Sequence, residues 1–167
     1  MNVLLSVVNA DIYHSPKHKH PCWEVVYRLS GSSDTTIGNH THRITEGDLY
    51  LVPPNVFHED IAQDPFTDSV IRLDDLPFVD TIILHNVDAL IRSFFQMINY
   101  VMSKKDNNYN VVANSLAVAF FQYLTTYSLI SKHFVHKIKD ILFKNIGNPD
   151  FNLTKEIKDM NYNPDYI

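Results

Sequence analysis

The chain has 167 residues, of which 45% are hydrophobic and 20% charged, and its formal net charge is −5. This composition is typical of a globular protein, and the negative charge argues against a basic surface made for nucleic acid. Cys22 is the only cysteine, which excludes an internal disulfide and fits a reducing cytosol. Because no secretion signal and no run of about 18 apolar residues occur, we expect a cytoplasmic protein without a membrane span.

The first part of the chain has the pattern of short strands separated by turn residues. Residues 23–30 alternate between two faces, and both faces carry apolar side chains, so we expect both to be covered. A hairpin is predicted around Gly38, and two further strands are predicted at 57–61 and 69–73. About seven strands at this spacing favour a closed β-barrel or jelly roll.

The pattern then changes to helical periodicity. Apolar residues recur at steps of three and four from Val87 to Met102, with Asn86 or Asp88 as the predicted cap. After a polar break, a second apolar stripe is formed by Val112, Leu116, Phe120, Tyr123, Leu124, Tyr127 and Ile130. Two such helices joined by a short loop usually pack antiparallel, and their stripes need the barrel, each other or a second copy as a partner.

The last part of the chain predicts a series of shorter helices. One helix begins near Phe134 and ends at Gly147, the residue type that favours a left-handed helix end. Asn152 is the predicted cap of a short helix, a turn follows, and residues 164–167 begin another helix. Because the chain stops as that helix begins, we expect it to be a piece of a longer protein.

Four residues carry the clearest chemical pattern, H-x-H-x3-E followed by a distant histidine. His18, His20 and Glu24 lie at spacings that place strand residues on one face, and His58 can join them from an adjacent strand. Three imidazoles and one carboxylate suit Fe, Mn, Ni, Zn or Cu. The alternative is a polar, hydrogen-bonded pocket lining that holds no metal.

These residues and the glycines and proline around them resemble the two motifs of the cupin family, small β-barrels of jelly-roll type. All four metal-ligand positions of the family are matched. The resemblance implies a divalent metal, Zn, Ni, Mn or Fe, at His18, His20, Glu24 and His58. Three family positions depart from the pattern, at Ile12, Asn55 and Ala62, and these departures weaken a claim of catalysis more than a claim of fold.

Two residues after the histidine motif are candidates for the ligand pocket. Val26 and Arg28 share the face of Glu24 if the strand alternation holds. Arg28 is four strand residues, or about 13 Å, from Glu24, so we do not expect the two to form an ion pair. Arg28 would either anchor an anion in the pocket or emerge at the barrel rim into water, and we favour the rim.

The order of a barrel, two long helices and the segment from Ile141 to Ile167 resembles an AraC-type transcriptional regulator. In that family the cupin-like domain senses a small molecule, the helices dimerise, and two helix-turn-helix units bind DNA. The resemblance implies three parts: a sensing barrel at 1–80, a helical dimerisation segment at 81–131, and the start of the DNA-binding domain at 132–167. Only the first residues of the recognition helix are present, where Asn163, Asp165 and Tyr166 are the candidate DNA contacts.

The sequence therefore predicts a mixed α+β protein that is not an enzyme. We expect it to bind a small-molecule effector, to form a homodimer through residues 86–131, and to bind DNA only as part of the full-length regulator. A metal-dependent cupin enzyme of the dioxygenase or isomerase type is the alternative, and the helix-turn-helix spacing after residue 152 argues against it. A bare dimerisation module with a barrel filled by side chains is a third interpretation.

Overall fold

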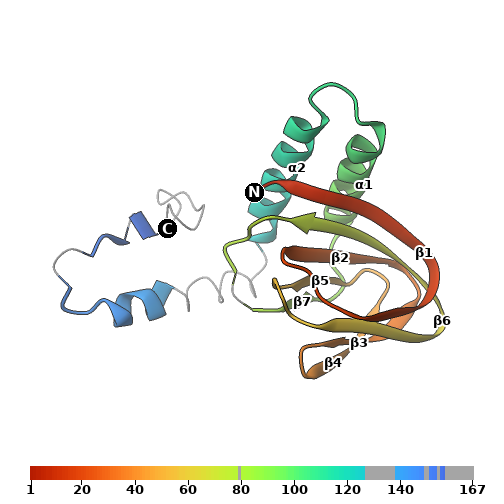
Figure 1. Ribbon diagram of the computed structural model, residues 1–167, viewed down its shortest axis with the longest axis horizontal. Coiled ribbons are helices and arrows are strands. Elements are labelled where there is room, and N and C mark those ends of the chain that lie inside the picture. The colour runs from red at the N-terminus through yellow and green to blue at the C-terminus, as the bar shows by residue number, and fades with distance from the viewer. Residues whose placement is uncertain (79, 127–137, 149–150, 154, 157–167) are drawn as a thin grey trace.

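The computed structural model describes residues 1–78, 80–126, 138–148, 151–153 and 155–156 (Figure 1). Its strands are β1 (Val3–His18), β2 (Trp23–Ser30), β3 (Ser32–Ile37), β4 (His40–Thr45), β5 (Leu49–Val52), β6 (His58–Leu73) and β7 (Ile82–Leu84). Two long helices follow, α1 (Ala89–Lys104) and α2 (Tyr109–Leu124). Strands followed by helices confirm the predicted α+β class. Neither helix is long and apolar enough to cross a membrane.

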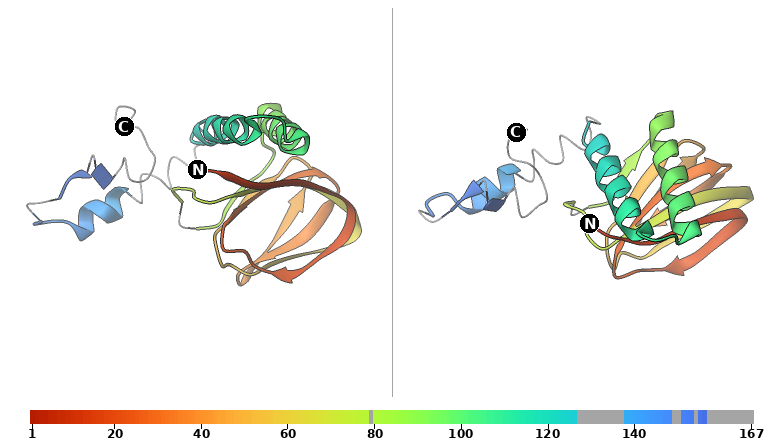
Figure 2. Two further views of the ribbon diagram at one scale, coloured as in Figure 1. Left: turned by 45° about the horizontal axis from the view of Figure 1, so that its top comes forward. Right: turned by 90° about the horizontal axis from the view of Figure 1, so that it is seen from above.

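All seven strands form one antiparallel sheet in which β6 is the central element. The strand order is β4-β3-β6-β2-β5-β7, and β1 pairs along the other edge of β6. Strand β6 pairs with β3 through its first half and with β2 through its second half, which bends it and curls the sheet into a half-barrel (Figure 2). The prediction of two separate strands at 57–61 and 69–73 is wrong, because the polar residues between them continue the pairing with β1 through register shifts near Ile12.

Side chains alternate between the two faces of the curled sheet. On β2, Trp23, Val25 and Tyr27 belong to the larger apolar cluster, which also includes the buried faces of α1 and α2. Val26 belongs to a second, smaller cluster on the inner face. Both faces of β2 are therefore covered, as the alternation predicts.

The two helices lie side by side over the outer face of the sheet (Figure 2). Asp88 caps α1 by accepting hydrogen bonds from the backbone amides of Leu90 and Ile91, which confirms one of the two predicted caps. The predicted stripe of α2 is partly wrong: Val112 is exposed, and the buried face instead runs through Ala113 and Ala117. Small residues at these positions let α2 approach its neighbours closely. A pattern of large apolar residues does not identify alanine positions as the buried face.

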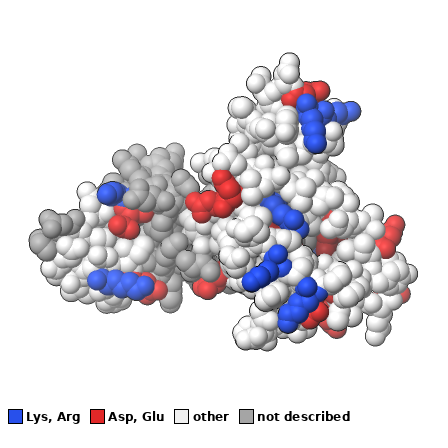
Figure 3. Space-filling view, in the orientation of Figure 1, with Lys and Arg blue, Asp and Glu red and all other residues white. Residues whose placement is uncertain are grey.

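Less of the C-terminal segment is described. Residues 138–144 are helical, and Gly147 has a positive φ of 86° after that helix. Asn152 accepts a hydrogen bond from the backbone amide of Lys155 at 3.0 Å, the contact expected of a cap. The candidate DNA contacts Asn163, Asp165 and Tyr166 lie outside the described residues. On the face shown in Figure 3, acidic and basic side chains of the described residues are interspersed.

Candidate metal and ligand site

The structure brings His18, His20, Glu24 and His58 together at one end of the half-barrel. One possible ligand atom from each lies within 4.8 Å of the others, and the ring centroids of His18 and His58 are 4.2 Å apart. The four residues come from three strands and one connection, because β1 ends at His18, His20 lies in the connection that follows, Glu24 is on β2 and β6 begins at His58. The expected single strand carrying the motif is therefore wrong, although its residues do converge. The β1–β6 register, which pairs His18 with His58, completes the group.

The loop before β6 holds its conformation without glycine. Asn55 has a positive φ of 63°, a backbone region that asparagine tolerates better than most residues. Its backbone amide donates to the carbonyl oxygen of His20 at 2.6 Å, which ties the histidine turn to this loop. The departure from the family pattern at Asn55 therefore leaves the loop geometry intact.

Two of the histidines are held by backbone carbonyl groups. Nδ1 of His18 lies 2.6 Å from the carbonyl oxygen of Pro16, and Nδ1 of His58 lies 3.1 Å from that of Val56. A carbonyl oxygen can only accept, so in each neutral ring Nδ1 carries the hydrogen and Nε2 keeps its lone pair. This is the arrangement by which a second hydrogen bond orients a metal-ligating histidine.

Glu24 is the charged centre of the group. Its Oε1 lies 3.1 Å from Nε2 of His58, and its Oε2 accepts a hydrogen bond from Nε of Arg72 at 2.8 Å. Burial opposes ionisation of Glu24, but the hydrogen bonds from the protonated form of His58 and from Arg72 lower its pKa to about 2. Burial opposes the charged form of His58 as well, and its contact with Glu24 outweighs this and raises its pKa. Glu24 is therefore a carboxylate at neutral pH.

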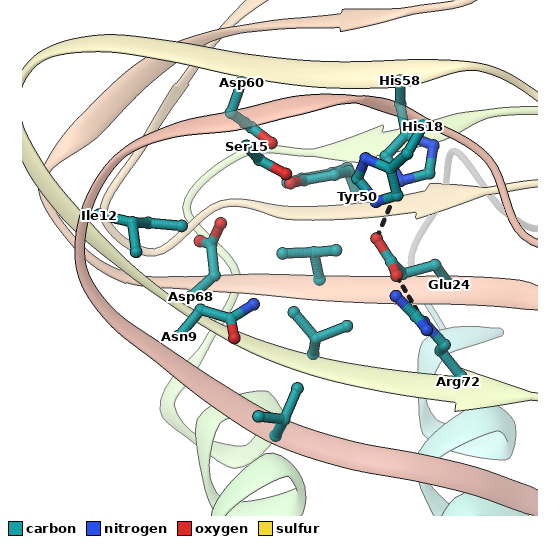
Figure 4. A pocket seen from close by; sticks show the side chains of 13 residues that line it. Asn9, Ile12, Ser15, His18, Glu24, Tyr50, His58, Asp60, Asp68 and Arg72 are labelled. Carbon is teal, nitrogen blue, oxygen red and sulfur yellow. Dashed lines mark hydrogen bonds and ion pairs between the residues drawn. The ribbon is translucent and has the colours of Figure 1, made fainter.

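Arg72 is a functional residue that the sequence did not reveal. Its contact with Glu24 is shown in Figure 4, and its Nη2 also lies 2.7 Å from Nε2 of His20, so its guanidinium contacts two of the four candidate ligands. The β2–β6 register pairs it with Glu24, and this register cannot be deduced from local spacing. Burial, the largest effect, lowers the pKa of His20, and the charge of Arg72 acts in the same direction. The donor set of three imidazoles and an ionised carboxylate fits a divalent metal, with Arg72 as a competitor for two of the donors.

A cavity of about 130 Å³ opens from this group into the half-barrel. Its lining comprises Val7, Asn9, Ile12, Ser15, His18, Glu24, Val26, Tyr50, His58, Asp60, Asp68, Val70 and Arg72. Val26 is thus at the cavity wall, as expected, whereas Arg28 does not line the cavity.

Arg28 is fully buried, with 0% of its surface exposed, so the expectation that it emerges at the rim is wrong. Its guanidinium also forms ion pairs with protein carboxylates, so it is not available to anchor an anion. Nε donates to Asp68 at 2.5 Å, and Nη2 lies 3.4 Å from Asp60. The physical reason is that two acidic residues of β6 lie beside Arg28, with Asp68 its direct cross-strand partner.

Residues 3–76 match the family model of the AraC-like ligand binding domain. The N-terminal part of the chain is therefore similar to an AraC-like ligand binding domain, and its curled sheet surrounds the cavity. No curated protein matches the chain.

Solved structures with similar folds include a protein described only as a cupin and two enzymes. An RmlC-like cupin from Shewanella frigidimarina is 18% identical with a TM-score of 0.41, covering 44% of this chain and 68% of that one. A variant of oxalate decarboxylase from Bacillus subtilis is 22% identical with a TM-score of 0.40, covering 44% and 21%. A DMSP lyase from Ruegeria pomeroyi is 25% identical with a TM-score of 0.37, covering 46% and 40%.

Proposed function

We propose that this chain is the ligand-sensing and dimerisation portion of an AraC-family transcriptional regulator. A small-molecule effector binds in the half-barrel cavity, the helices form the contact between two copies, and the C-terminal segment leads into a DNA-binding domain. The observation that carries the proposal is that the matched ligand binding domain, residues 3–76, encloses a polar cavity. Such cavities with a few convergent polar groups are the usual ligand sites of proteins.

One layer of sheet separates the cavity from the helices, which supports a sensing role. On β6, Asp68 and Val70 line the cavity, while the intervening Ser69 accepts a hydrogen bond from the side chain of Asn99 on α1 at 2.6 Å. On β2, Tyr27 packs against Phe95 of α1 with ring centroids 5.6 Å apart. A shift of β2 or β6 on effector binding is therefore passed directly to α1.

The metal belongs to the same proposal. His18, His20, Glu24 and His58 hold a divalent ion, Zn, Ni, Mn or Fe, which when bound supplies a Lewis-acid contact for an oxygen atom of the effector. The protein orients two of the imidazoles through the carbonyl oxygens of Pro16 and Val56. It also keeps Glu24 ionised.

The exposed face of the helices supports association with a second copy. Large apolar side chains that remain exposed there are Leu90, Met97, Tyr100, Val111, Val112 and Val118. Light scattering of the chain should give the mass of a dimer, and Tyr100→Glu should shift it to monomer, because a charge would be buried in the contact. Tyr13→Glu, at a residue of similar exposure that lies on strand β1 and not on a helix, should leave the dimer unchanged. A strict monomer at high micromolar concentration contradicts this part of the proposal.

A thermal-shift screen of small polar compounds tests the sensing function. We expect at least one compound to raise the melting temperature and, at the same concentrations, to change the fraction of dimer in light scattering. A compound that raises the melting temperature without any effect on association contradicts coupling between the cavity and the helices. A screen in which no compound binds contradicts sensing itself.

A metal-dependent enzyme is the second candidate, because the metal-capable group opens directly onto the cavity. The two functions differ in what happens to the bound compound. After incubation with metal-loaded protein at substoichiometric concentration, an NMR spectrum should show an effector unchanged. Conversion of many equivalents per chain would instead show an enzyme.

A further inference from the structure

The cavity has a second polar end, away from the histidines, that the proposed function leaves without a role. Asp60 and Asp68 of β6 and Tyr50 of β5 line it (Figure 4). On the facing strand β1, Ser15 pairs in register with Asp60 and Asn9 pairs with Asp68. We call Asp60, Asp68, Tyr50, Ser15 and Asn9 the acidic end.

The acidic end holds more negative than positive charge. Asp60 and Asp68 are 4% and 3% exposed, and the cation in contact with both is Arg28. Two carboxylates against one guanidinium leave a net charge of −1 when both are ionised. Burial raises the pKa of Asp68 to about 6 in spite of Arg28, which shows that the second negative charge is unfavourable there. A cationic group entering the cavity would remove this penalty.

Two acceptor atoms of the acidic end have no partner among the described residues. Oδ1 of Asp60 accepts hydrogen bonds from Ser33, Thr35 and Arg28, and its Oδ2 accepts none. The hydroxyl group of Tyr50 likewise has no hydrogen-bond partner in the described part of the chain, although the residue is only 2% exposed and lines the cavity. The fully buried atom without a hydrogen-bond partner in the described part of the chain is Nη1 of Arg28, whereas Asp60 and Tyr50 line the cavity, where a donor group from a ligand can reach their free acceptor atoms.

We propose that the acidic end binds the ammonium group of a small ω-amino acid, with Asp60 Oδ2 and the Tyr50 hydroxyl oxygen as acceptors. The inference rests on the proposed function, since it names the class of effector. An ammonium group donates three hydrogen bonds and carries the charge that the acidic end lacks. A neutral hydroxyl group would supply a donor but no charge.

The opposite end of the cavity fits the carboxylate of the same ligand. Arg72 lines that end, its side chain is 29% exposed, and a guanidinium matches a carboxylate with two parallel hydrogen bonds. The volume of about 130 Å³ corresponds to on the order of ten water-sized groups, which limits the ligand to a short chain.

Calorimetric titration with matched probes tests the inference. The series is glycine, β-alanine, 4-aminobutyrate and 5-aminovalerate, each compared with the hydroxy acid and the unsubstituted acid of the same length, with and without added zinc. We expect one amino acid to bind about tenfold or more tighter than its hydroxy and unsubstituted analogues, as for a lost charge-assisted hydrogen bond. Equal binding of the three analogues at every length overturns the inference.

Variants locate the ammonium group. Asp60→Asn should weaken the binding of the best amino acid about tenfold and leave the binding of the unsubstituted acid unchanged. Tyr50→Phe, which removes only a hydroxyl group, should also weaken the binding of the amino acid. Asp34→Asn, at an exposed carboxylate of β3, is the control and should have no effect. If Asp60→Asn fails to fold, Tyr50→Phe decides. If Tyr50→Phe binds the amino acid as tightly as the native chain, and Asp60→Asn does so as well where it folds, the inference is overturned.

The outcome also separates this inference from the proposed function. If no amino acid binds while the thermal-shift screen finds an effector of another class, the ω-amino acid inference fails and sensing stands. If nothing binds in either experiment, both fail.

Discussion

Two arginines near the cavity have different surroundings: Arg72 lines the cavity, whereas Arg28 contacts Asp60 and Asp68 from outside the lining. Arg28 at the acidic end is 0% exposed, lies between Asp60 and Asp68, and stacks over Phe66 at 4.1 Å from the ring centroid. Arg72 at the histidine end is 29% exposed and contacts Glu24 and His20. Arg28 is therefore a fixed part of the core, whereas Arg72 can move toward water when a metal or ligand arrives.

This difference shows how one sheet can combine stability with binding. A fully buried ion pair with several hydrogen bonds has no alternative partner, so its loss destabilises the fold. A partly exposed arginine can exchange its protein partners for solvent at small cost. The ion pairs of Arg28 therefore fix the structure beside the acidic end of the cavity, whereas the side chain of Arg72 can change its contacts at the histidine end.

Replacement of the buried arginine should have the largest effect. Arg28→Met leaves Asp60 and Asp68 buried without a cation, so we expect the free energy of unfolding to fall by about 3–5 kcal/mol. Urea denaturation measures this change. Arg43→Met, which breaks the exposed ion pair with Asp34, should change it by less than about 1 kcal/mol. Equal effects of the two substitutions would remove the distinction between fixed and adjustable arginines.

The two ends should also respond to pH in opposite directions. The lowered pKa of Glu24, about 2 against 4.5, contributes stability that is present above pH 4.5 and is lost as the pH falls toward 2. The raised pKa of Asp68, about 6 against 3.8, contributes stability that is present below pH 3.8 and is lost as the pH rises through 6. Each contribution is about 3 kcal/mol.

Urea denaturation at a series of pH values checks both signs. Glu24→Gln should flatten the change in unfolding free energy below pH 4.5, and Asp68→Asn should flatten the decline between pH 4 and 6. Asp34→Asn serves as the exposed control. A decline between pH 4 and 6 that persists unchanged in Asp68→Asn would contradict the charge imbalance at the acidic end.

Metal binding should stabilise the fold through the histidine end alone. With zinc at 100 times its dissociation constant, we expect about 2.7 kcal/mol of stabilisation, and a chelator should reverse it. The effect should weaken as the pH falls below about 6.5, because protons compete with the metal for the imidazoles. Differential scanning calorimetry should show the shift in the native chain and in His40→Ala, an exposed histidine outside the group. A similar shift in His58→Ala would place the metal elsewhere.

The smallest expected change concerns the competition between Arg72 and the metal. Arg72→Met frees one oxygen of Glu24 and the Nε2 of His20, and it removes a positive charge beside the site. We expect about tenfold tighter zinc binding, equivalent to about 1.4 kcal/mol, in a calorimetric titration. Arg43→Met should bind zinc like the native chain. Weaker binding in Arg72→Met would instead make Arg72 a support for the ligands.

The sequence predicted most of what depends on local spacing. The alternation of β2, the Asp88 cap and the two histidine motifs themselves are encoded within short segments, whereas the meeting of His18 with His58 depends on the β1–β6 register. The acidic end and the role of Arg72 depend on which residues of β6 face β1 and β2, and that register results from the bend of a 16-residue strand. Arg28 was misplaced for the same reason, because its partners lie 32 and 40 residues away.

Elemental analysis of the untagged chain tests most directly whether the histidine end of the cavity is a metal site. After equilibration with zinc, nickel, manganese or iron and removal of free ions, the native chain should contain about one equivalent of at least one metal. His58→Ala should retain much less, and His40→Ala should match the native chain. Occupancy far below one equivalent for every metal in the native chain would show that His18, His20, Glu24 and His58 form only a polar lining of the cavity.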